Sequence, residues 1–94
     1  MAYVVVMPKL GLTMRVGLVA RWLVELGEHV VEEAPLLEVE TDKITTEVGS
    51  PSAGVLLGRV EPEVEVPVGE PIAILGDPAE DVSSIALYGS GSEP

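Results

Sequence analysis

The sequence repeats itself, because several segments of its first half recur 36 positions later in its second half. The recurring segments are a valine followed by a glutamate, a lone valine, and a proline followed by an aliphatic residue. They pair Val24-Glu25 with Val60-Glu61, Val30 with Val66, and Pro35-Leu36 with Pro71-Ile72. Half of a 94-residue chain cannot bury an apolar face alone. We therefore expect one domain whose halves pack together as two sheets.

Short runs of valine, leucine and isoleucine, separated by glycine and proline, favour many short strands. No helical periodicity interrupts them. The strands that we expect are residues 3–7, 17–24, 36–40, 44–48, 55–60, 64–68 and 71–75. The sequence therefore predicts an all-β domain.

Alternation within these strands predicts part of the core. Leu37 and Val39 should face inward, with the glutamates beside them facing solvent. The same alternation places Val19 and Trp22 on opposite faces of their strand. We expect Leu37, Val39, Trp22 and Ile44 to be core residues.

The character of the chain changes near its end. Residues 78–94 are mostly small and polar and include Gly89-Ser90-Gly91-Ser92. We expect residues 1–77 to form the domain and residues 78–94 to be a flexible linker or an added tail. The sequence does not decide whether the short apolar stretch from Ile85 to Leu87 packs against the domain.

Charge narrows the range of partners. The formal net charge of −11 repels phosphate groups, so neither nucleic acid nor an anionic membrane surface is expected to bind. A protein with a basic patch fits better, although the same charge also serves to keep a small domain soluble.

Composition excludes several kinds of chemistry as well. The chain has no cysteine, so any dithiol chemistry has to come from an attached group. Its only histidine, His29, lacks the second histidine of a zinc site, so we expect no metal site and an exposed His29. No apolar run approaches the ~20 residues that a membrane-spanning helix needs. Asparagine and glutamine are absent, which favours a protein from a hot environment.

Lys43 ends the short polar segment Thr41-Asp42-Lys43 between two expected strands. This pattern indicates a β-hairpin with the lysine at its tip. A solvated amine is protonated at neutral pH and a weak nucleophile, but it is accessible to an enzyme that acylates it. An ordinary surface lysine has the same local pattern, so periodicity alone leaves both readings open.

Longer segments are more specific. Residues 38–48 (EVETDKITTEV) resemble the lipoylation motif of the lipoyl-domain family, and residues 7–14 (MPKLGLTM) resemble that family's first segment. The other matching segments are Trp22-Leu23-Val24, residues 35–39, Ala53-Gly54-Val55-Leu56 and residues 67–72. The resemblance extends over residues 4–77, and this combination is far more specific than the Asp42-Lys43 pair alone.

The resemblance implies a fold and a function. The family fold is a flattened barrel or sandwich of two four-stranded antiparallel sheets with quasi-twofold symmetry. In the family, lipoic acid is amide-linked to the lysine that matches Lys43, and Thr41, Asp42 and Ile44 frame it. The implied role is a monomeric carrier domain in the acyltransferase component of a 2-oxo acid dehydrogenase complex. Such a domain is no enzyme by itself, and its expected location is the bacterial cytoplasm.

The implied partners are a lipoate-attaching enzyme, a thiamine-diphosphate-dependent 2-oxo acid decarboxylase, the acyltransferase core and dihydrolipoamide dehydrogenase. The lipoyl group would carry acyl groups and electrons between the last three. Recognition is expected from a loop and from the hairpin, through Leu10, Gly11 and Leu12 and through Glu40 and Asp42. We expect Met14 to lie beneath the loop and Leu12 to be exposed.

Other classes fit less well. A biotin carrier shares the fold, but biotinylated lysines typically lie between two methionines, whereas Lys43 lies between Asp42 and Ile44. A structural adaptor of this fold usually carries a helical hairpin between its halves. No acid–base or nucleophile–base pair is visible, so no catalytic residue is expected.

Two turns depart from the family pattern. Family members usually have glycine where this chain has Glu33 or Ala34, and a Glu-Gly-Asp turn where it has Glu61-Pro62-Glu63. These departures put the local turn geometry in question. They lie away from Lys43.

Overall fold

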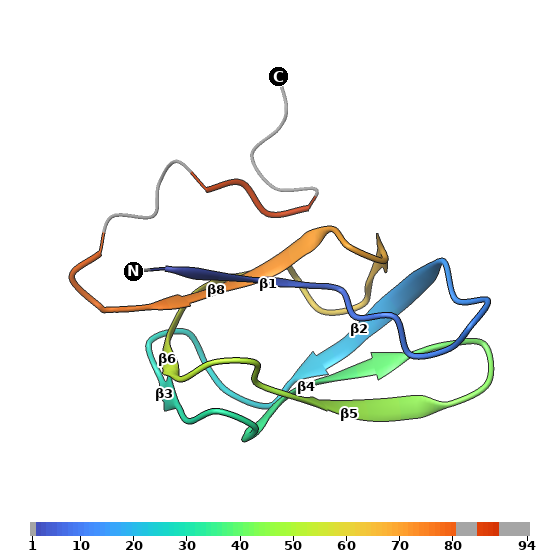
Figure 1. The fold of residues 1–94 in the computed structure, drawn as a ribbon, viewed down its shortest axis with the longest axis horizontal. Coiled ribbons are helices and arrows are strands. Elements are labelled where there is room, and N and C mark those ends of the chain that lie inside the picture. Colours follow the sequence, from blue (N-terminus) through green and yellow to red (C-terminus); the bar gives the residue numbers. More distant parts are fainter. Residues whose placement is uncertain (1, 81–84, 89–94) are drawn as a thin grey trace.

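A computed structural model describes residues 2–80 and 85–88, which form eight strands in two sheets (Figure 1). The strands are β1 (Tyr3–Val6), β2 (Val16–Trp22), β3 (His29–Val30), β4 (Pro35–Glu40), β5 (Thr45–Gly49), β6 (Gly54–Arg59), β7 (Val64–Pro67) and β8 (Pro71–Gly76). The four-stranded sheets have the orders β1-β8-β6-β3 and β5-β4-β2-β7, and all pairings within them are antiparallel. The predicted all-β fold is confirmed. Within the described residues, no helix is long and apolar enough to cross a membrane.

The two halves of the chain are related by quasi-twofold symmetry, as predicted. Exchanging β1–β4 for β5–β8 converts the strand order of one sheet into that of the other. The turns repeat too, since Gly27 and Glu63 have φ of 89° and 68°, and Glu33 and Gly69 have φ of 72° and 92°. Both pairs are again 36 positions apart. The turns that depart from the family pattern therefore keep a left-handed backbone at Glu33 and Glu63.

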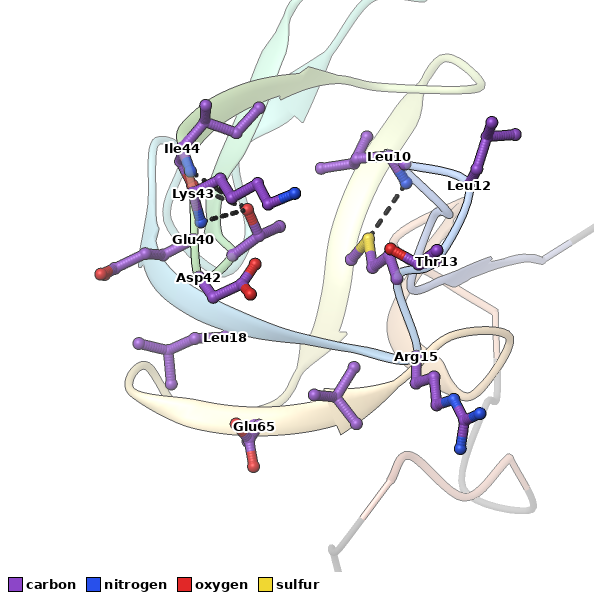
Figure 2. A pocket seen from close by; sticks show the side chains of 14 residues that line it. Leu10, Leu12, Thr13, Arg15, Leu18, Glu40, Asp42, Lys43, Ile44 and Glu65 are labelled. Carbon is purple, nitrogen blue, oxygen red and sulfur yellow. Dashed lines mark hydrogen bonds between the residues drawn. The ribbon is translucent and has the colours of Figure 1, made fainter.

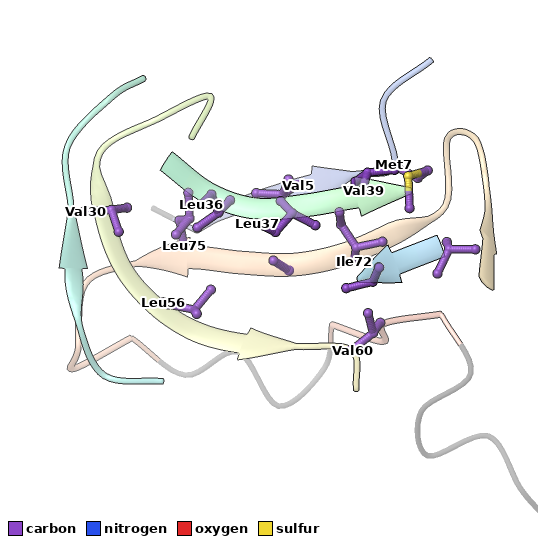
Figure 3. Packing of buried hydrophobic residues seen from close by; sticks show 13 residues of the cluster. Val5, Met7, Val30, Leu36, Leu37, Val39, Leu56, Val60, Ile72 and Leu75 are labelled. Atoms are coloured by element: carbon purple, nitrogen blue, oxygen red, sulfur yellow. The ribbon is translucent and has the colours of Figure 1, made fainter. Parts of the chain in front are cut away.

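The core lies between the two sheets and draws on both halves (Figure 3). Leu36 and its counterpart Ile72 are fully buried, and so are Val39 and its counterpart Leu75. Leu37 is fully buried as well, so the predicted inward orientation of Leu37 and Val39 is confirmed. Because each half supplies two strands to each sheet, and the core draws on both halves, neither half is expected to fold alone.

The predicted alternation is wrong in β2. Val19 is fully buried and Trp22 packs against the same core, although alternation put them on opposite faces. The register of β2 against β4 shifts between Val19 and Arg21, so Ala20 is an extra residue that reverses the alternation. Trp22 joins the core as predicted, and its indole N–H donates to the carbonyl of Val60 at 2.9 Å.

The end of the chain contacts the domain in one described place. Leu87 packs against the core, and the Tyr88 N–H donates to the carbonyl of Pro71 at 2.9 Å. The end of the apolar stretch, at Leu87, therefore lies against the domain. Residues 81–84 and 89–94 lie outside the described residues, and the linker or tail assigned to 78–94 stays a prediction.

The left-handed turns lead to a stability prediction. Gly69→Ala should destabilise the domain by about 1 kcal/mol, because a Cβ strains a left-handed backbone by roughly 1–2 kcal/mol while alanine recovers part of this in the unfolded chain. Gly11→Ala is the matched control, because Gly11 is equally free of neighbours within 4 Å but has no positive φ. Urea unfolding should show a change within about 0.5 kcal/mol for the control. Equal losses of unfolding free energy in Gly69→Ala and Gly11→Ala would show that the left-handed backbone at Gly69 is not the cause.

Candidate functional site

The hairpin between β4 and β5 closes on a threonine side chain. The Thr41 N–H donates to the carbonyl of Ile44 at 2.7 Å, and Thr41 Oγ1 accepts from the amides of Lys43 at 3.3 Å and Ile44 at 3.2 Å. Neither Asp42 nor Lys43 has a positive φ, so the turn needs no glycine. The hydroxyl accepts where a backbone carbonyl otherwise would, as in other serine and threonine turns. The result is a fixed tip that carries Lys43.

The prediction that Ile44 belongs to the core is wrong. The residue still lies in the turn, because β5 begins at Thr45, and its side chain is 54% exposed. The hydrogen bonds to Thr41 hold the backbone of Ile44 in the turn, which places the side chain beside Lys43 rather than between the sheets.

A second segment, residues 10–15, lies next to the hairpin, and we refer to it as the groove loop. The Leu10 N–H donates to Met14 Sδ at 3.0 Å, and the Met14 N–H donates to the carbonyl of Gly11 at 3.3 Å. Leu10 and Met14 both pack against the core, whereas Leu12 is 94% exposed. The predicted positions of Met14 and Leu12 are therefore confirmed.

The groove loop and the hairpin form the two walls of an open groove of about 840 Å³ (Figure 2). The Lys43 side chain extends across the groove toward Leu10. All the residues proposed for attachment or recognition line this groove: Leu10, Gly11, Leu12, Glu40, Thr41, Asp42, Lys43 and Ile44. The structure therefore brings together two segments that are 30 residues apart in the sequence, counted from Leu12 to Asp42.

Sequence reasoning missed the floor and one end of the groove. Leu18 in β2 pairs with Glu40 on one side and with Glu65 of β7 on the other, which makes a row of one leucine between two glutamates. Arg15 and Thr13 also line the groove. The alternating glutamates of residues 61–65 could have indicated that Glu65 faces outward. The pairing of β7 with β2 is long-range, however, and no local sequence pattern indicates it.

The charges around Lys43 are mixed. Glu40, Asp42 and Glu65 share the groove with Lys43 and Arg15. In the part of the chain that the structure describes, Lys43 makes no ion pair, unlike Arg21, whose guanidinium binds Glu38 at 3.0 Å. The amine is therefore exposed and not held by a carboxylate, which suits a group that another enzyme modifies.

Among residues 2–80 and 85–88, no group of three His, Cys, Asp or Glu side chains lies close enough together to bind a metal ion. The exposed His29 lies in β3, which pairs only with β6 at the edge of its sheet. The predicted exposure of this histidine is confirmed.

Comparison with known proteins connects this geometry to a family. The family model for biotin- and lipoyl-bearing domains, described as "Biotin-requiring enzyme", matches residues 3–75. The chain belongs to the biotin/lipoyl domain family. It is also 47% identical over 81 residues to the dihydrolipoyllysine-residue acetyltransferase component of the pyruvate dehydrogenase complex of Corynebacterium glutamicum. That match covers 85% of the chain and 12% of the relative.

Two further relatives bear similar names. The corresponding pyruvate dehydrogenase component of Mycobacterium tuberculosis is 45% identical over 77 residues, covering 81% of the chain and 14% of the relative. The acetyltransferase component of the acetoin cleaving system of Cupriavidus necator is 44% identical over 77 residues, covering 81% and 20%. The chain thus spans only a small part of these relatives. All three names specify a lipoyllysine residue, and the predicted relationship to lipoyl domains of acyltransferases is confirmed.

Proposed function

We propose that this domain carries lipoic acid in amide linkage to Nζ of Lys43. The observation that carries the proposal is the position of Lys43, exposed at the tip of a hydrogen-bonded turn in a domain whose relatives are named for a lipoyllysine. The site fits the group, since the amine makes no ion pair and an open groove leaves room beside it. When bound, the lipoyl group supplies the reversible dithiol that this cysteine-free chain lacks.

The residues of the chain position that group. Thr41 fixes the backbone of Lys43, so the flexible arm begins at a defined point on the surface. Asp42 and Ile44 flank the attachment point and give the modifying enzyme a polar and an apolar contact. The rigid turn lowers the conformational entropy that the modifying enzyme has to remove on binding.

We place the domain in the acyltransferase component of a bacterial, cytoplasmic 2-oxo acid dehydrogenase complex, because bacterial relatives are components of the pyruvate dehydrogenase complex. The lipoyl arm would take an acyl group from a thiamine-diphosphate-dependent decarboxylase and deliver it to the acyltransferase core. Dihydrolipoamide dehydrogenase would then reoxidise the dithiol. The names of the relatives favour pyruvate or acetoin as the source of the acyl group.

Intact mass tests the cofactor. Incubation with a lipoate–protein ligase and lipoate should add one lipoyl group, whereas a biotin–protein ligase with biotin should add nothing. Reductive acylation of the lipoylated domain should then be fastest with a thiamine-diphosphate-dependent enzyme that decarboxylates pyruvate or cleaves acetoin, compared with decarboxylases specific for 2-oxoglutarate and branched-chain 2-oxo acids. Biotin uptake, or equal acylation by all four enzymes, would contradict the proposal.

Recognition by the decarboxylase is expected to depend on both walls of the groove. Leu12→Ser should lower kcat/KM for reductive acylation about 5- to 30-fold, the range that corresponds to one or two kcal/mol of lost contact. Glu40→Gln should lower it by a smaller factor that fades with salt, because exposed charges are screened beyond ~8–10 Å.

Matched controls lie outside the groove. Leu26 is also exposed, at 55%, and Glu32 is an exposed acid elsewhere on the surface. Leu26→Ser and Glu32→Gln should leave kcat/KM within about twofold of the unaltered domain, because neither residue lines the groove. Acylation of all four variants at the unaltered rate in low salt would place recognition elsewhere on the domain.

A further inference from the structure

We propose that Met14 is a reversible oxidation site, and that its sulfur sets the conformation of the groove loop. Met14 stands at the centre of this loop's hydrogen bonding. Its sulfur accepts the N–H of Leu10 at 3.0 Å, and its own N–H donates to the carbonyl of Gly11 at 3.3 Å. A thioether is a weak acceptor, so a modest chemical change at this one sulfur removes a contact across the loop.

Exposure favours Met14 over Met7, the other methionine in the described part of the chain. Met14 is half-buried and lines the open groove, whereas Met7 is 1% exposed within the core. Both pack around Gly17, where an added Cβ would lie 2.8 Å from Met14 Cε and 2.9 Å from Met7 Sδ. The two sulfurs therefore share a neighbourhood and differ in access to solvent, which makes Met7 an internal control.

The reaction needs a peroxide as oxidant. One peroxide oxygen is transferred to Met14 Sδ, so the thioether becomes a sulfoxide and hydrogen peroxide is reduced to water. Reduction by a methionine sulfoxide reductase returns the thioether, while two thiols become a disulfide and the oxygen leaves as water. The two reactions together restore the original side chain and alter no covalent bond of the backbone.

Oxidation changes both roles of Met14. One sulfur lone pair already accepts from Leu10, and oxygen added there would occupy the 3.0 Å gap between Sδ and the Leu10 nitrogen. Oxygen added to the other lone pair makes the packed end of the side chain polar and withdraws electrons from the sulfur. Either epimer therefore disrupts the 3.0 Å contact between the Leu10 N–H and Met14 Sδ, and the groove loop moves relative to Lys43.

The test uses hydrogen peroxide on the domain before lipoylation, so that the only sulfur present is that of methionine. Trypsin separates Met14, in residues 10–15, from Met7, in residues 1–9, because Lys9 and Arg15 are cleavage sites, and fragment spectra of residues 1–9 distinguish Met7 from Met1. Mass spectrometry should show one added oxygen on Met14 at least about tenfold faster than on Met7, as exposure governs susceptibility. Equal rates at both methionines would overturn the assignment of the site.

A second measurement follows the loop itself. Amide hydrogen exchange at Leu10 should be about two- to fivefold faster after oxidation, the factor that corresponds to the lower part of the range for one hydrogen bond, because a thioether is a weak acceptor. Methionine sulfoxide reductase should restore the original rate, and peroxide should not change exchange at Leu10 in Met14→Leu, while Met7→Leu should still respond. An unchanged Leu10 amide in fully oxidised protein would overturn the proposed role of the sulfur. These readouts do not depend on lipoylation, so they stand apart from the proposed carrier function.

Discussion

Lys43→Arg should abolish lipoylation of the domain. Arginine keeps the positive charge and the length of the side chain, and the turn is held by Thr41 rather than by the lysine side chain. A guanidinium, however, stays protonated and delocalised, so it does not form the amide that a lysine amine forms with activated lipoate. After incubation with a lipoate–protein ligase, the intact mass of the variant should lack the lipoyl group entirely, and reductive acylation should be absent.

Lys9→Arg is the matched control, because Lys9 is the only other lysine in the chain and is also exposed. It should gain one lipoyl group at the unaltered rate. Both variants should keep their unfolding free energy within about ±0.5 kcal/mol, as expected for exposed substitutions. A lipoyl group on Lys43→Arg, or its loss from Lys9→Arg, would move the attachment site to Lys9.

The hairpin and the pseudosymmetry could be predicted because their causes are local or repeated. Alternation predicted the inward orientation of Leu37 and Val39 correctly, because the pairing of β4 with β5 is regular from Leu37 onward. The 36-residue repeat reflects two halves with the same strand order, so pairs of residues such as Leu36 and Ile72 occupy equivalent core positions. Such features can be predicted from the sequence wherever buried positions recur with a fixed period.

Two of the features that the sequence did not predict depend on long-range strand pairing, and the third depends on hydrogen bonds to a side chain. The bulge at Ala20 depends on the register of β2 against β4. No residue type in β2 indicates a bulge, so the prediction of which residues of β2 share a face was wrong. The floor of the groove at Leu18 depends on β7 lying beside β2, although those strands are more than 40 residues apart in the chain. The exposed position of Ile44 follows from hydrogen bonds to the Thr41 hydroxyl, which extend the turn by one residue beyond the expected strand start.

Leu37 and Ile44 should therefore respond very differently to truncation. Leu37→Ala is expected to cost about 2–5 kcal/mol of unfolding free energy, because the side chain is fully buried and its removal leaves a cavity between the sheets. Ile44→Ala is expected to cost less than about 1 kcal/mol, since much of its side chain is already in solvent. A small domain of typical stability has about 5–15 kcal/mol in total, so the first change threatens folding and the second does not.

Leu75→Ala extends the comparison to the other sheet. Leu75 in β8 is the symmetry counterpart of Val39 and is fully buried, so its truncation should fall in the same range as that of Leu37. Since the halves share one core, each variant should unfold in one transition, with the same midpoint by tryptophan fluorescence and by far-ultraviolet circular dichroism. The fluorescence of Trp22 reports on the core, because its indole N–H donates a hydrogen bond to the carbonyl of Val60 in the other half of the chain. An Ile44→Ala loss as large as that of Leu37→Ala would mean that the turn packs inward, and the exposed lysine tip would have to be abandoned with it.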